Sequence, residues 1–399
     1  MLSNRALSSS DSVTMRLNEK ALQLTEEGRV IYNLSAGQLP IKPTSEFTEK
    51  IQHQVNFLKS YQYPPSAGFK ELRQKFLKTH AHNRKVEKIE SMDCIVSNGS
   101  KHSLYNVFGS IINPDDEVII LAPFWVSYPE MIKFWGGTTK TVRSNVFDAF
   151  TPAIDDIRKA VSQKTKAIII NSPNNPAGIH YSESWMKEFA LLMTEFPQLL
   201  VISDEVYSDL YYFDPKPTYF YQYDPELLER TIIVHSISKS LASTGLRIGF
   251  TIAQKEIVEA MQRIQSQTTS GANSLIQRAL IDFNFSSIDH FLAPVRNHIR
   301  LNAMYIQEMF RKSKLAHCWY QSTSGFYYMI DFSRTPMFEK YDRDKDWSDE
   351  IAAKLLEVGV LVVPGKDFGM PNSFRISLVL EEIPFQEALT KLLKFLTAQ

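Results

Sequence analysis

Cysteine is scarce in this chain, which has only Cys94 and Cys318 among its 399 residues. Two cysteines exclude a disulfide framework and a cysteine-based zinc site, so we expect no metal site, and the low count suits a reducing cytoplasm. No apolar run is long enough to span a membrane, and the Ser-rich residues 1–11 lack the hydrophobic segment of a signal peptide. We therefore expect a cytoplasmic protein with no membrane partner, in which residues 1–11 form a flexible arm.

The chain also lacks a net charge, because 44 Lys and Arg residues balance 44 Asp and Glu residues. A balanced charge argues against the broad basic surface that attracts nucleic acids, so we expect no nucleic-acid partner. Hydrophobic residues make up 44% of the chain and charged residues 22%, which is ordinary for a globular protein. A length of 399 residues is enough for two domains.

Short apolar runs alternate with helical patterns over much of the chain. The runs are rich in β-branched residues and are bounded by polar or turn residues: Cys94–Val96, Val118–Leu121, Ala167–Ile170, Leu199–Ile202, Ile232–Val234 and Ile248–Ile252. Strands that are apolar on both faces are typical of a mainly parallel sheet covered by helices. Helices are predicted between them, at Ser100–Ile112 and Met186–Phe196, so the pattern indicates an α/β fold.

The pattern changes near residue 285, where a smaller α+β domain is predicted to begin. Its expected elements are a long helix, three strands and a last helix: Ser287–Phe310, Phe326–Ile330, Val360–Val363, Phe374–Ser377 and Pro384–Leu396. A helix at Leu17–Glu27 and an extended segment at Val30–Leu34 join this domain. We therefore expect an N-terminal arm and part of the small domain in 1–40, a large cofactor-binding domain in 41–285, and the small C-terminal domain in 286–399.

Lys239 lies in the run Ser236-Ile237-Ser238-Lys239, directly after an apolar strand, and Arg247 follows eight positions later. In open α/β sheets ligands bind beyond the carboxyl ends of the strands. A lysine amine there can form a Schiff base with pyridoxal phosphate, and Ser236, Ser238 and Arg247 would then hold the phosphate. The alternative is an exposed lysine at the end of a strand.

Asp204 and Tyr207 follow the predicted strand Leu199–Ile202. A carboxylate beside a pyridine nitrogen keeps that nitrogen protonated and makes the ring a better electron sink, while Tyr207 would reach the ring oxygen. The alternative for Asp204 is a helix cap.

Three other loops offer further groups for a flat, phosphorylated ligand. Trp125 would stack on a ring, or it packs in the core. Asn175, in the Asn- and Pro-rich loop 171–178, would donate to a phenolate oxygen, or the loop is a plain turn. Gly99 and Ser100 stand at the start of a predicted helix and would bind a phosphate, with a simple N-cap at Ser100 as the alternative.

Arg375 lies in a short extended stretch near the C-terminus, Ser373–Ser377. A guanidinium binds a carboxylate through two parallel hydrogen bonds, so Arg375 suits the α-carboxylate of an amino acid. A structural ion pair is the alternative.

Together these motifs resemble the fold-type I pyridoxal-phosphate-dependent aminotransferases of class I/II, in particular the bacterial branch of aspartate aminotransferases. The resemblance covers nearly the whole chain and rests on these motifs: Ala36-Gly37, Tyr63-Pro64-Pro65-Ser66-Ala67-Gly68, Gly99-Ser100-Lys101, Pro123-Phe124-Trp125-Val126-Ser127-Tyr128-Pro129-Glu130-Met131, Asn171-Ser172-Pro173-Asn174-Asn175-Pro176-Ala177-Gly178, Asp204-Glu205-Val206-Tyr207, Lys239, Arg247 and Arg375. It implies a mainly parallel seven-stranded sheet in a large cofactor domain, a smaller α+β domain, and pyridoxal 5'-phosphate as the cofactor.

The resemblance also implies the role of each site residue. Lys239 carries the cofactor as an aldimine and moves the Cα proton, Asp204 pairs with the pyridinium nitrogen, and Tyr207 is the third catalytic residue. The implied cofactor contacts are Gly99, Ser100, Lys101, Trp125, Asn175, Asp204, Tyr207, Ser236, Lys239, Arg247 and, from the neighbouring subunit of a homodimer, Tyr63. The implied substrate contacts are Gly37, Lys101, Trp125, Asn175 and Arg375.

Substrate choice depends on residues where the resemblance is less complete. Lys101 resembles the reader of a distal carboxylate, which favours aspartate or glutamate; the alternative is that it only adds positive charge near the phosphate. The run Ala36–Pro40 replaces a more acidic loop, and Leu246 stands where a Trp is frequent. The aromatic-rich segment Tyr211–Tyr223 either packs in a loop or interface, or lines an edge that alters substrate preference.

The expected reaction is a reversible, ping-pong transamination between an amino acid and a 2-oxo acid. Aspartate or glutamate is the expected donor, and a broad or aromatic specificity is the alternative. A β-lyase or synthase reaction on the same cofactor is a second hypothesis. A non-catalytic cofactor-binding regulator is a third, and the short segment before the small domain leaves little room for the DNA-binding domain that such regulators carry.

Overall fold

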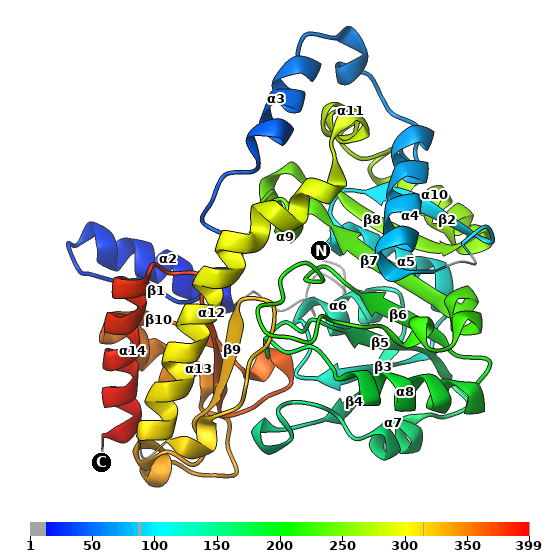
Figure 1. The fold of residues 1–399 in the computed structure, drawn as a ribbon. Helices are drawn as coiled ribbons and strands as arrows, with labels where there is room; N and C mark the ends of the chain where they lie inside the picture. Colours follow the sequence, from blue (N-terminus) through cyan, green and yellow to red (C-terminus); the bar gives the residue numbers. More distant parts are fainter. Residues whose placement is uncertain (1–12, 87–88, 314, 399) are drawn as a thin grey trace, which may run out of the picture.

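The computed structural model describes residues 13–86, 89–313 and 315–398, so the predicted flexible arm lies outside the described residues. A sheet of seven strands forms the centre of the larger part of the molecule (Figure 1). In spatial order its strands are β2 (Met92–Ser97), β8 (Gly249–Gln254), β7 (Thr231–Ser236), β6 (Leu200–Asp204), β5 (Thr165–Asn171), β3 (Glu117–Ala122) and β4 (Thr138–Arg143).

All neighbouring strands from β7 to β4 pair in parallel, whereas β8 is antiparallel to both β2 and β7. The mainly parallel seven-stranded sheet is therefore confirmed. The antiparallel direction of β8 has a consequence for the site. Its first residue lies at the same edge of the sheet as the last residues of β5, β6 and β7, which brings the segment before Gly249 to that edge.

Apolar residues alternate between two cores, one on each face of the sheet. In β5, Ile168 and Ile170 belong to one core, and Ala167 and Ile169 belong to the other. This is why the central strands read as continuous apolar runs in the sequence. The edge strand β4, whose sequence is TTKTVR, is mostly exposed and was not predicted because it lacks such a run.

Helices cover both faces of the sheet (Figure 1). In chain order the helices of this part are α3 (Ser45–Gln54), α4 (Lys70–Arg84), α5 (Ser100–Ile111), α6 (Ser127–Phe134), α7 (Ile154–Ala160), α8 (Glu183–Glu195), α9 (Ile237–Ser240), α10 (Lys255–Thr268) and α11 (Ser274–Asp282). The predicted helices after Ser100 and Met186 correspond to α5 and α8. Helices α3 and α11 pack together at the top of the view in Figure 1.

The smaller part combines both ends of the chain at the lower left of Figure 1. Its helices and strands are α2 (Val13–Glu26), β1 (Tyr32–Asn33), α12 (Ile288–Lys312), β9 (Tyr327–Asp331), α13 (Ser348–Glu357), β10 (Val360–Leu361), β11 (Val363–Pro364), β12 (Ser373–Ser377) and α14 (Glu382–Thr397). Because β1 pairs in parallel with β10, the N-terminal residues join the C-terminal strands as expected. The boundaries at residues 40 and 285 stay a prediction, which this pairing supports.

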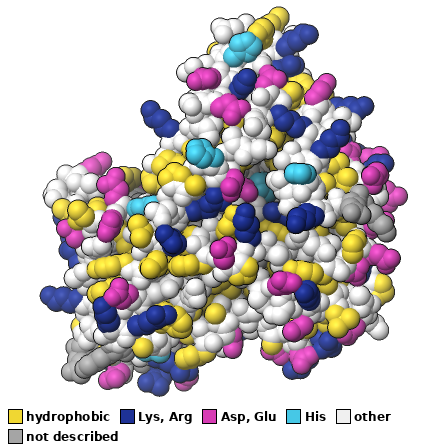
Figure 2. Space-filling model, in the orientation of Figure 1, with side chains coloured by type: hydrophobic (Ala, Val, Ile, Leu, Met, Phe, Trp, Pro, Cys, Tyr) yellow, Lys and Arg dark blue, Asp and Glu magenta, His cyan; other side chains and the backbone are white. Residues whose placement is uncertain are grey.

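Two observations bear on the predictions made from composition, one on surface charge and one on membrane-spanning helices. Acidic and basic side chains are interspersed over the face that Figure 2 shows. Within the described ranges, no helix combines the length and the apolar character needed to cross a bilayer.

Gly178 joins the loop after β5 to the segment that precedes β9, in the smaller part of the molecule. Its carbonyl accepts hydrogen bonds from the backbone N–H groups of Thr323 (2.8 Å) and Ser324 (3.0 Å). Its φ is +68°, and a Cβ atom there would overlap the carbonyl oxygen of Tyr327. Glycine is therefore required by both conformation and space.

We expect Gly178→Ala to lower the free energy of unfolding by about 2 kcal/mol or more, because it adds left-handed strain to a clash with β9. Chemical denaturation measures the loss. Gly245→Ala is the matched control, since its Cβ would meet no atom within 4 Å and its φ is not positive. Equal stability of the two variants would contradict the expectation.

Candidate active site

A cavity of about 270 Å³ lies at the edge of the sheet where β5, β6 and β7 end. Ten of the predicted site residues line it: Gly37, Ser100, Lys101, Trp125, Asn175, Asp204, Tyr207, Lys239, Arg247 and Arg375. Ser238, also named from the sequence, lines it as well. Residues from the N-terminal segment, five loops of the sheet and the strand β12 thus converge on one space, close in size to the smaller ligand sites of proteins.

Lys239 lies in the four-residue helix α9, directly after β7, and is only 9% exposed. The alternative of an exposed strand-end lysine is therefore wrong. Its Nζ donates a hydrogen bond to the carbonyl of Gly37. Burial, followed by the positive charges of Arg375 and Arg247, lowers the pKa of the amine to about 7. At neutral pH a large fraction of this amine is unprotonated, the form that acts as a nucleophile or a base.

Asp204 is the last residue of β6 and is almost fully buried. Burial raises the pKa of its carboxyl to about 6, and the hydrogen bonds from the Tyr128 hydroxyl and the Val206 N–H (3.3 Å) oppose that rise. The carboxylate therefore stays mainly ionised at pH 7, as a partner for a cationic ring must be. A turn, not a helix, follows Asp204, so the helix-cap alternative is wrong.

Tyr207 and Asn175 line the cavity, and each contacts another residue of the lining through a polar group. The Tyr207 hydroxyl lies 3.3 Å from the Tyr327 hydroxyl, and its pKa is raised well above the ordinary value, mainly by burial. The Asn175 Oδ1 accepts from the Arg375 guanidinium (3.0 Å), and its backbone N–H donates to the Asn171 Oδ1 (2.9 Å). The loop after β5 is therefore a fixed support for the Asn175 amide, not a plain turn.

Arg375 lies in β12 with its side chain almost fully buried. Besides Asn175, it donates to the Ser35 carbonyl (3.2 Å), and neither acceptor is a carboxylate, so the ion-pair alternative is wrong. Its Nε has no hydrogen-bond partner among the described residues although it is buried. A buried guanidinium with an unused donor suits a ligand carboxylate.

The opposite end of the cavity is suited to an anion. Ser100 is the first residue of α5, and Gly99, with φ +83°, is the N-cap residue, so the simple N-cap alternative for Ser100 is wrong. A Cβ atom at Gly99 would overlap the Arg247 guanidinium. Arg247 and the N-terminus of α5 therefore meet there, and both favour negative charge.

Trp125 is half-buried, and it both packs against the edge of one core and lines the cavity, so the core alternative holds in part. The Lys101 ammonium lies 5.0 Å from the centre of its ring, and burial and Arg247 lower the pKa of that ammonium. Lys101 and Trp125 thus form one wall of the cavity.

Three predicted site residues lie outside the cavity lining: Gly99, which is described above, Ser236 and Tyr63. Ser236 is fully buried, and its hydroxyl caps α9 by accepting from the Ser238 N–H (2.9 Å) while lying 2.9 Å from the Ile248 carbonyl. Tyr63 is 90% exposed and lines a separate surface hollow with Tyr61 and Pro64. All three cofactor roles stay predictions, and that of Tyr63 requires a second chain.

The aromatic segment Tyr211–Tyr223 does not line the cavity. Tyr219, Phe220 and Tyr221 are buried, and Tyr219 stacks on Tyr221 with ring centres 5.6 Å apart. These three residues therefore pack within the fold, whereas Tyr211, Tyr212 and Phe213 line a separate hollow, and an effect of the segment on substrate preference stays a prediction.

Sequence reasoning missed three residues that shape the site. Tyr128 binds Asp204 and stands three residues after Trp125, in a motif that was quoted without a role for it. Tyr327 and Thr244 line the cavity. Tyr327 sits inside an apolar strand, where no sequence signal separates it from core aromatics.

The residues present fit pyridoxal phosphate, which is flat, anionic at one end and reactive at an aldehyde. The α5 N-terminus and Arg247 form an anion-binding end, Asp204 offers a carboxylate for a ring nitrogen, and the buried Lys239 lines the same cavity. Among the residues that the structure describes, no group of three or more His, Cys, Asp and Glu could hold a metal ion.

Comparisons with known proteins agree with this geometry. Residues 29–392 match the family model described as aminotransferase class I and II. The chain is 32% identical over 394 residues to a probable aspartate/prephenate aminotransferase of Thermus aquaticus, covering 98% of each chain. It is 30% identical over 396 residues to the aspartate aminotransferase of Bacillus subtilis, covering 99% of this chain and 98% of the other.

A solved structure of the Thermus thermophilus aspartate aminotransferase with maleate superposes with a TM-score of 0.88 at 30% identity, covering 99% of this chain and 100% of that one. The family's cofactor is pyridoxal phosphate. The chain therefore belongs to the class I and II aminotransferases, as a pyridoxal-phosphate-dependent enzyme that exchanges an amino group between an amino acid and a 2-oxo acid.

Proposed function

We propose that the amino donor carries two carboxylates, as aspartate and glutamate do. The observation that carries this proposal is the pair of cations, Arg375 and Lys101, that line the cavity in addition to Lys239 and Arg247. Arg375 suits the α-carboxylate, which leaves Lys101 for the distal one. The relatives named as aspartate aminotransferases and the relative solved with maleate, a dicarboxylate, support this assignment.

The cofactor site is assigned to groups at both ends of the cavity. Ser100 and Arg247 hold the phosphate, with Gly99 allowing the close approach, and Asp204 pairs with the ring nitrogen. Bound pyridoxal phosphate supplies the electron sink for the pair left at the substrate Cα. Ser236 can bind the phosphate only if its hydroxyl gives up the hydrogen bond from the Ser238 N–H that caps α9. Ser238 already lines the cavity.

The remaining assignments concern the ring and its orientation. Trp125 stacks on one face of the ring, in line with its position in the cavity wall. Asn175 and Tyr207 donate to the ring oxygen; the Asn175 oxygen is already engaged by Arg375, which leaves its amide N–H groups for this task. Gly37 and Arg375 hold the substrate α-carboxylate at the opposite side.

Lys239 has two tasks in this proposal, nucleophile first and proton carrier afterwards. Its pKa of about 7 allows both, because the amine gains and loses a proton near neutral pH. The surrounding rings of Tyr207 and Phe326, at 5.6 and 5.3 Å from Nζ, exclude water from the amine.

A homodimer with shared sites completes the proposal. Five apolar or aromatic side chains in one short segment are between 46% and 90% exposed: Val55, Phe57, Leu58, Tyr61 and Tyr63. Exposed apolar side chains gathered in this way mark a protein interface. A second copy covering this segment would bring Tyr63 to the phosphate end of its neighbour's cavity.

A cytoplasmic location is proposed on the state of the cysteines. Cys94 and Cys318 are both free and buried. Burial raises the pKa of the Cys318 thiol to about 12 and that of Cys94 still further, so both stay protonated and unreactive.

Lys239→Ala is expected to lower kcat for aspartate with 2-oxoglutarate by about 10⁴-fold or more, since the nucleophile and the proton carrier are lost together. Measuring the oxo acid product against time tests this. Lys164→Ala, at an exposed lysine, is the control. Turnover by Lys239→Ala close to that of the unmodified enzyme would refute the assignment.

Lys101→Ala is expected to lower kcat/KM for aspartate about 100-fold and for alanine less than about 5-fold, because only aspartate loses a charge-assisted bond. Lys101→Arg retains the positive charge and should recover part of the loss. Initial rates with both amino acids give the comparison. Equal losses on both substrates would remove the argument for a dicarboxylic donor.

Tyr63→Phe is expected to leave a dimer in sedimentation velocity and to weaken cofactor binding about 10-fold, the effect of one lost hydrogen bond to a charged group. Tyr61→Phe is the matched control, since this tyrosine is 62% exposed and bonds the carbonyl of Val55 in its own chain. A monomeric protein at micromolar concentration, or unchanged cofactor affinity, would contradict the shared site.

A further inference from the structure

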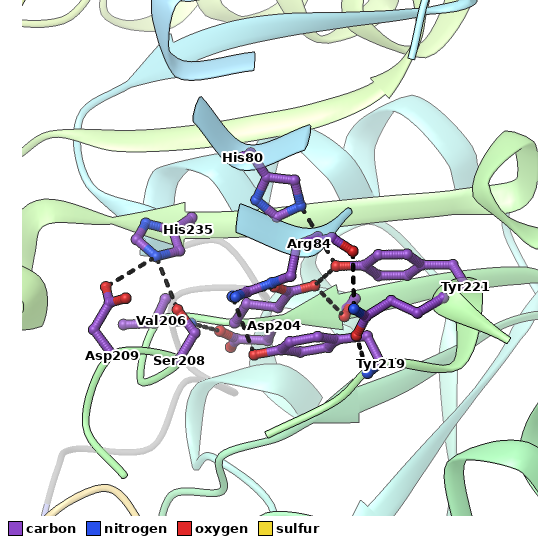
Figure 3. Close-up of polar contacts among 12 residues, drawn as sticks. His80, Arg84, Asp204, Val206, Ser208, Asp209, Tyr219, Tyr221 and His235 are labelled. Carbon is purple, nitrogen blue, oxygen red and sulfur yellow. Dashed lines mark hydrogen bonds and ion pairs between the residues drawn. The ribbon is translucent and has the colours of Figure 1, made fainter. Parts of the chain in front are cut away.

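A buried polar network lies behind Asp204, outside the residues that line the cavity (Figure 3). Its members come from α4, the end of β6, β7 and the turn at residues 219–222: His80, Arg84, Ser203, Glu205, Ser208, Asp209, Tyr219, Tyr221, Gln222 and His235. The reaction proposed above uses none of these side chains. The network therefore needs a separate explanation.

Glu205 is the centre of this network, and its side chain is fully buried. One carboxylate oxygen accepts from the Nε (3.2 Å) and the NH2 (3.1 Å) of Arg84. The other accepts from the hydroxyls of Tyr221 (2.7 Å) and Ser203 (3.0 Å). Four donors thus hold one carboxylate, which fixes its position from opposite sides.

Arg84, the last residue of α4, is itself held in place. Its guanidinium lies 4.5 Å from the centre of the Tyr219 ring, and the Gln222 amide donates to its backbone carbonyl (2.9 Å). Burial alone would lower its pKa, but the net shift is upward because Tyr219 and Glu205 favour the charged form. Arg84 is therefore a permanent positive charge facing Glu205.

The peptide unit that joins Asp204 to Glu205 is bonded on both sides. The Asp204 carbonyl accepts from the Asn171 amide (3.1 Å), and the Glu205 N–H donates to the Val234 carbonyl (2.8 Å). Because the two residues are consecutive, a shift of Glu205 would move the carboxylate of Asp204. Their charges are coupled too, since the negative charge of Glu205 raises the pKa of Asp204.

The ionisable groups around the two carboxylates come from several elements. Tyr128 of α6, Tyr207 of the following turn and His235 of β7 face Asp204. Those around Arg84 and Glu205 are His80, Asp209, Tyr219 and Tyr221. Burial lowers the pKa of His80 well below its usual value, so His80 is neutral and the positive charge opposite Glu205 comes from Arg84.

We propose that Glu205, held by Arg84 and Tyr221, is a positioning residue that aligns the Asp204 carboxylate for the cofactor's ring nitrogen, and that Arg84 offsets the negative charge that Glu205 places beside this carboxylate. The proposal rests on the cofactor site assigned above. Because Arg84 pairs directly with Glu205, its positive charge weakens the field that Glu205 exerts on Asp204. Glu205 can therefore anchor the backbone beside Asp204 with less tendency to protonate the Asp204 carboxylate. Glu205 and Arg84 act through Asp204 and touch no reacting atom.

The test starts from the cofactor-free protein and measures its affinity for pyridoxal phosphate at a series of pH values, with binding followed by the change in total tryptophan fluorescence. Affinity should fall as pH falls through the pKa of Asp204, near 6. Arg84→Gln leaves Glu205 uncompensated, so this acid limb should move up by about one pH unit. Glu205→Gln leaves Arg84 uncompensated, so the limb should move down by about half a unit or more.

The double variant Arg84→Gln/Glu205→Gln should return the limb to within about 0.3 unit of the unmodified protein, because the charges again balance. Arg73→Gln is the matched control. Arg73 lies in the same helix, is 19% exposed against 16% for Arg84, and pairs with Asp93, away from Asp204. Its limb should not move.

Shifts of opposite sign in the two single variants support the proposal. If the acid limb of cofactor affinity lies at the same pH in Arg84→Gln, Glu205→Gln and the unmodified protein, and the variants only unfold at a lower temperature, the pair has a purely structural role. That result would overturn the proposal. If Arg84→Gln does not fold, Glu205→Gln alone decides through its downward shift. An unmodified protein that binds no pyridoxal phosphate at any pH refutes the proposed function, whereas normal binding with unmoved limbs refutes only the role of Glu205.

Discussion

Burial of ionisable groups at one edge of a parallel sheet is the constraint on which the site depends. In water the Lys239 amine would be almost fully protonated at neutral pH and useless as a nucleophile. Its position in α9, near Arg375 and Arg247, brings its pKa to about 7. The same burial raises the pKa of Asp204 only to about 6, because Tyr128 and Val206 donate to it. One environment therefore holds a neutral base and an anion together.

The topology explains how distant parts of the chain reach this edge. Parallel strands place the ends of β5, β6 and β7 side by side, which brings Asn175, Asp204 and Lys239 together. The antiparallel β8 brings Arg247 to the same edge from the other direction. Strand β12, in the smaller part of the molecule, adds Arg375, so the cavity is formed where the two parts of the molecule meet.

Much of this could be predicted from the sequence, for identifiable reasons. The central strands are apolar on both faces, and their runs are therefore visible, whereas the exposed edge strand β4 has no such run. Lys239 and Asp204 could be predicted because a Schiff base requires a lysine, a ring nitrogen requires a carboxylate partner, and both residues follow predicted strands of the sheet. That Ser236 is buried as the N-cap of α9 while Ser238 lines the cavity could not be predicted, because the two nearby serines differ only in the direction that the local turn gives their side chains. The pairing of Arg84 with Glu205 joins residues 121 positions apart and leaves no local signal.

The cost of burying charge bears on why that pair exists. Removing two ions from water costs several kcal/mol per ion, and apolar replacements of buried pairs are often as stable or more so. Stability alone is therefore a weak explanation for a fully buried Glu205 and a nearly buried Arg84. An apolar residue at position 205 would leave the donors Arg84, Tyr221 and Ser203 without their acceptor beside Asp204. A balanced pair instead anchors the end of β6 with four hydrogen bonds and adds no net charge, which suits a neighbour whose carboxylate must stay ionised.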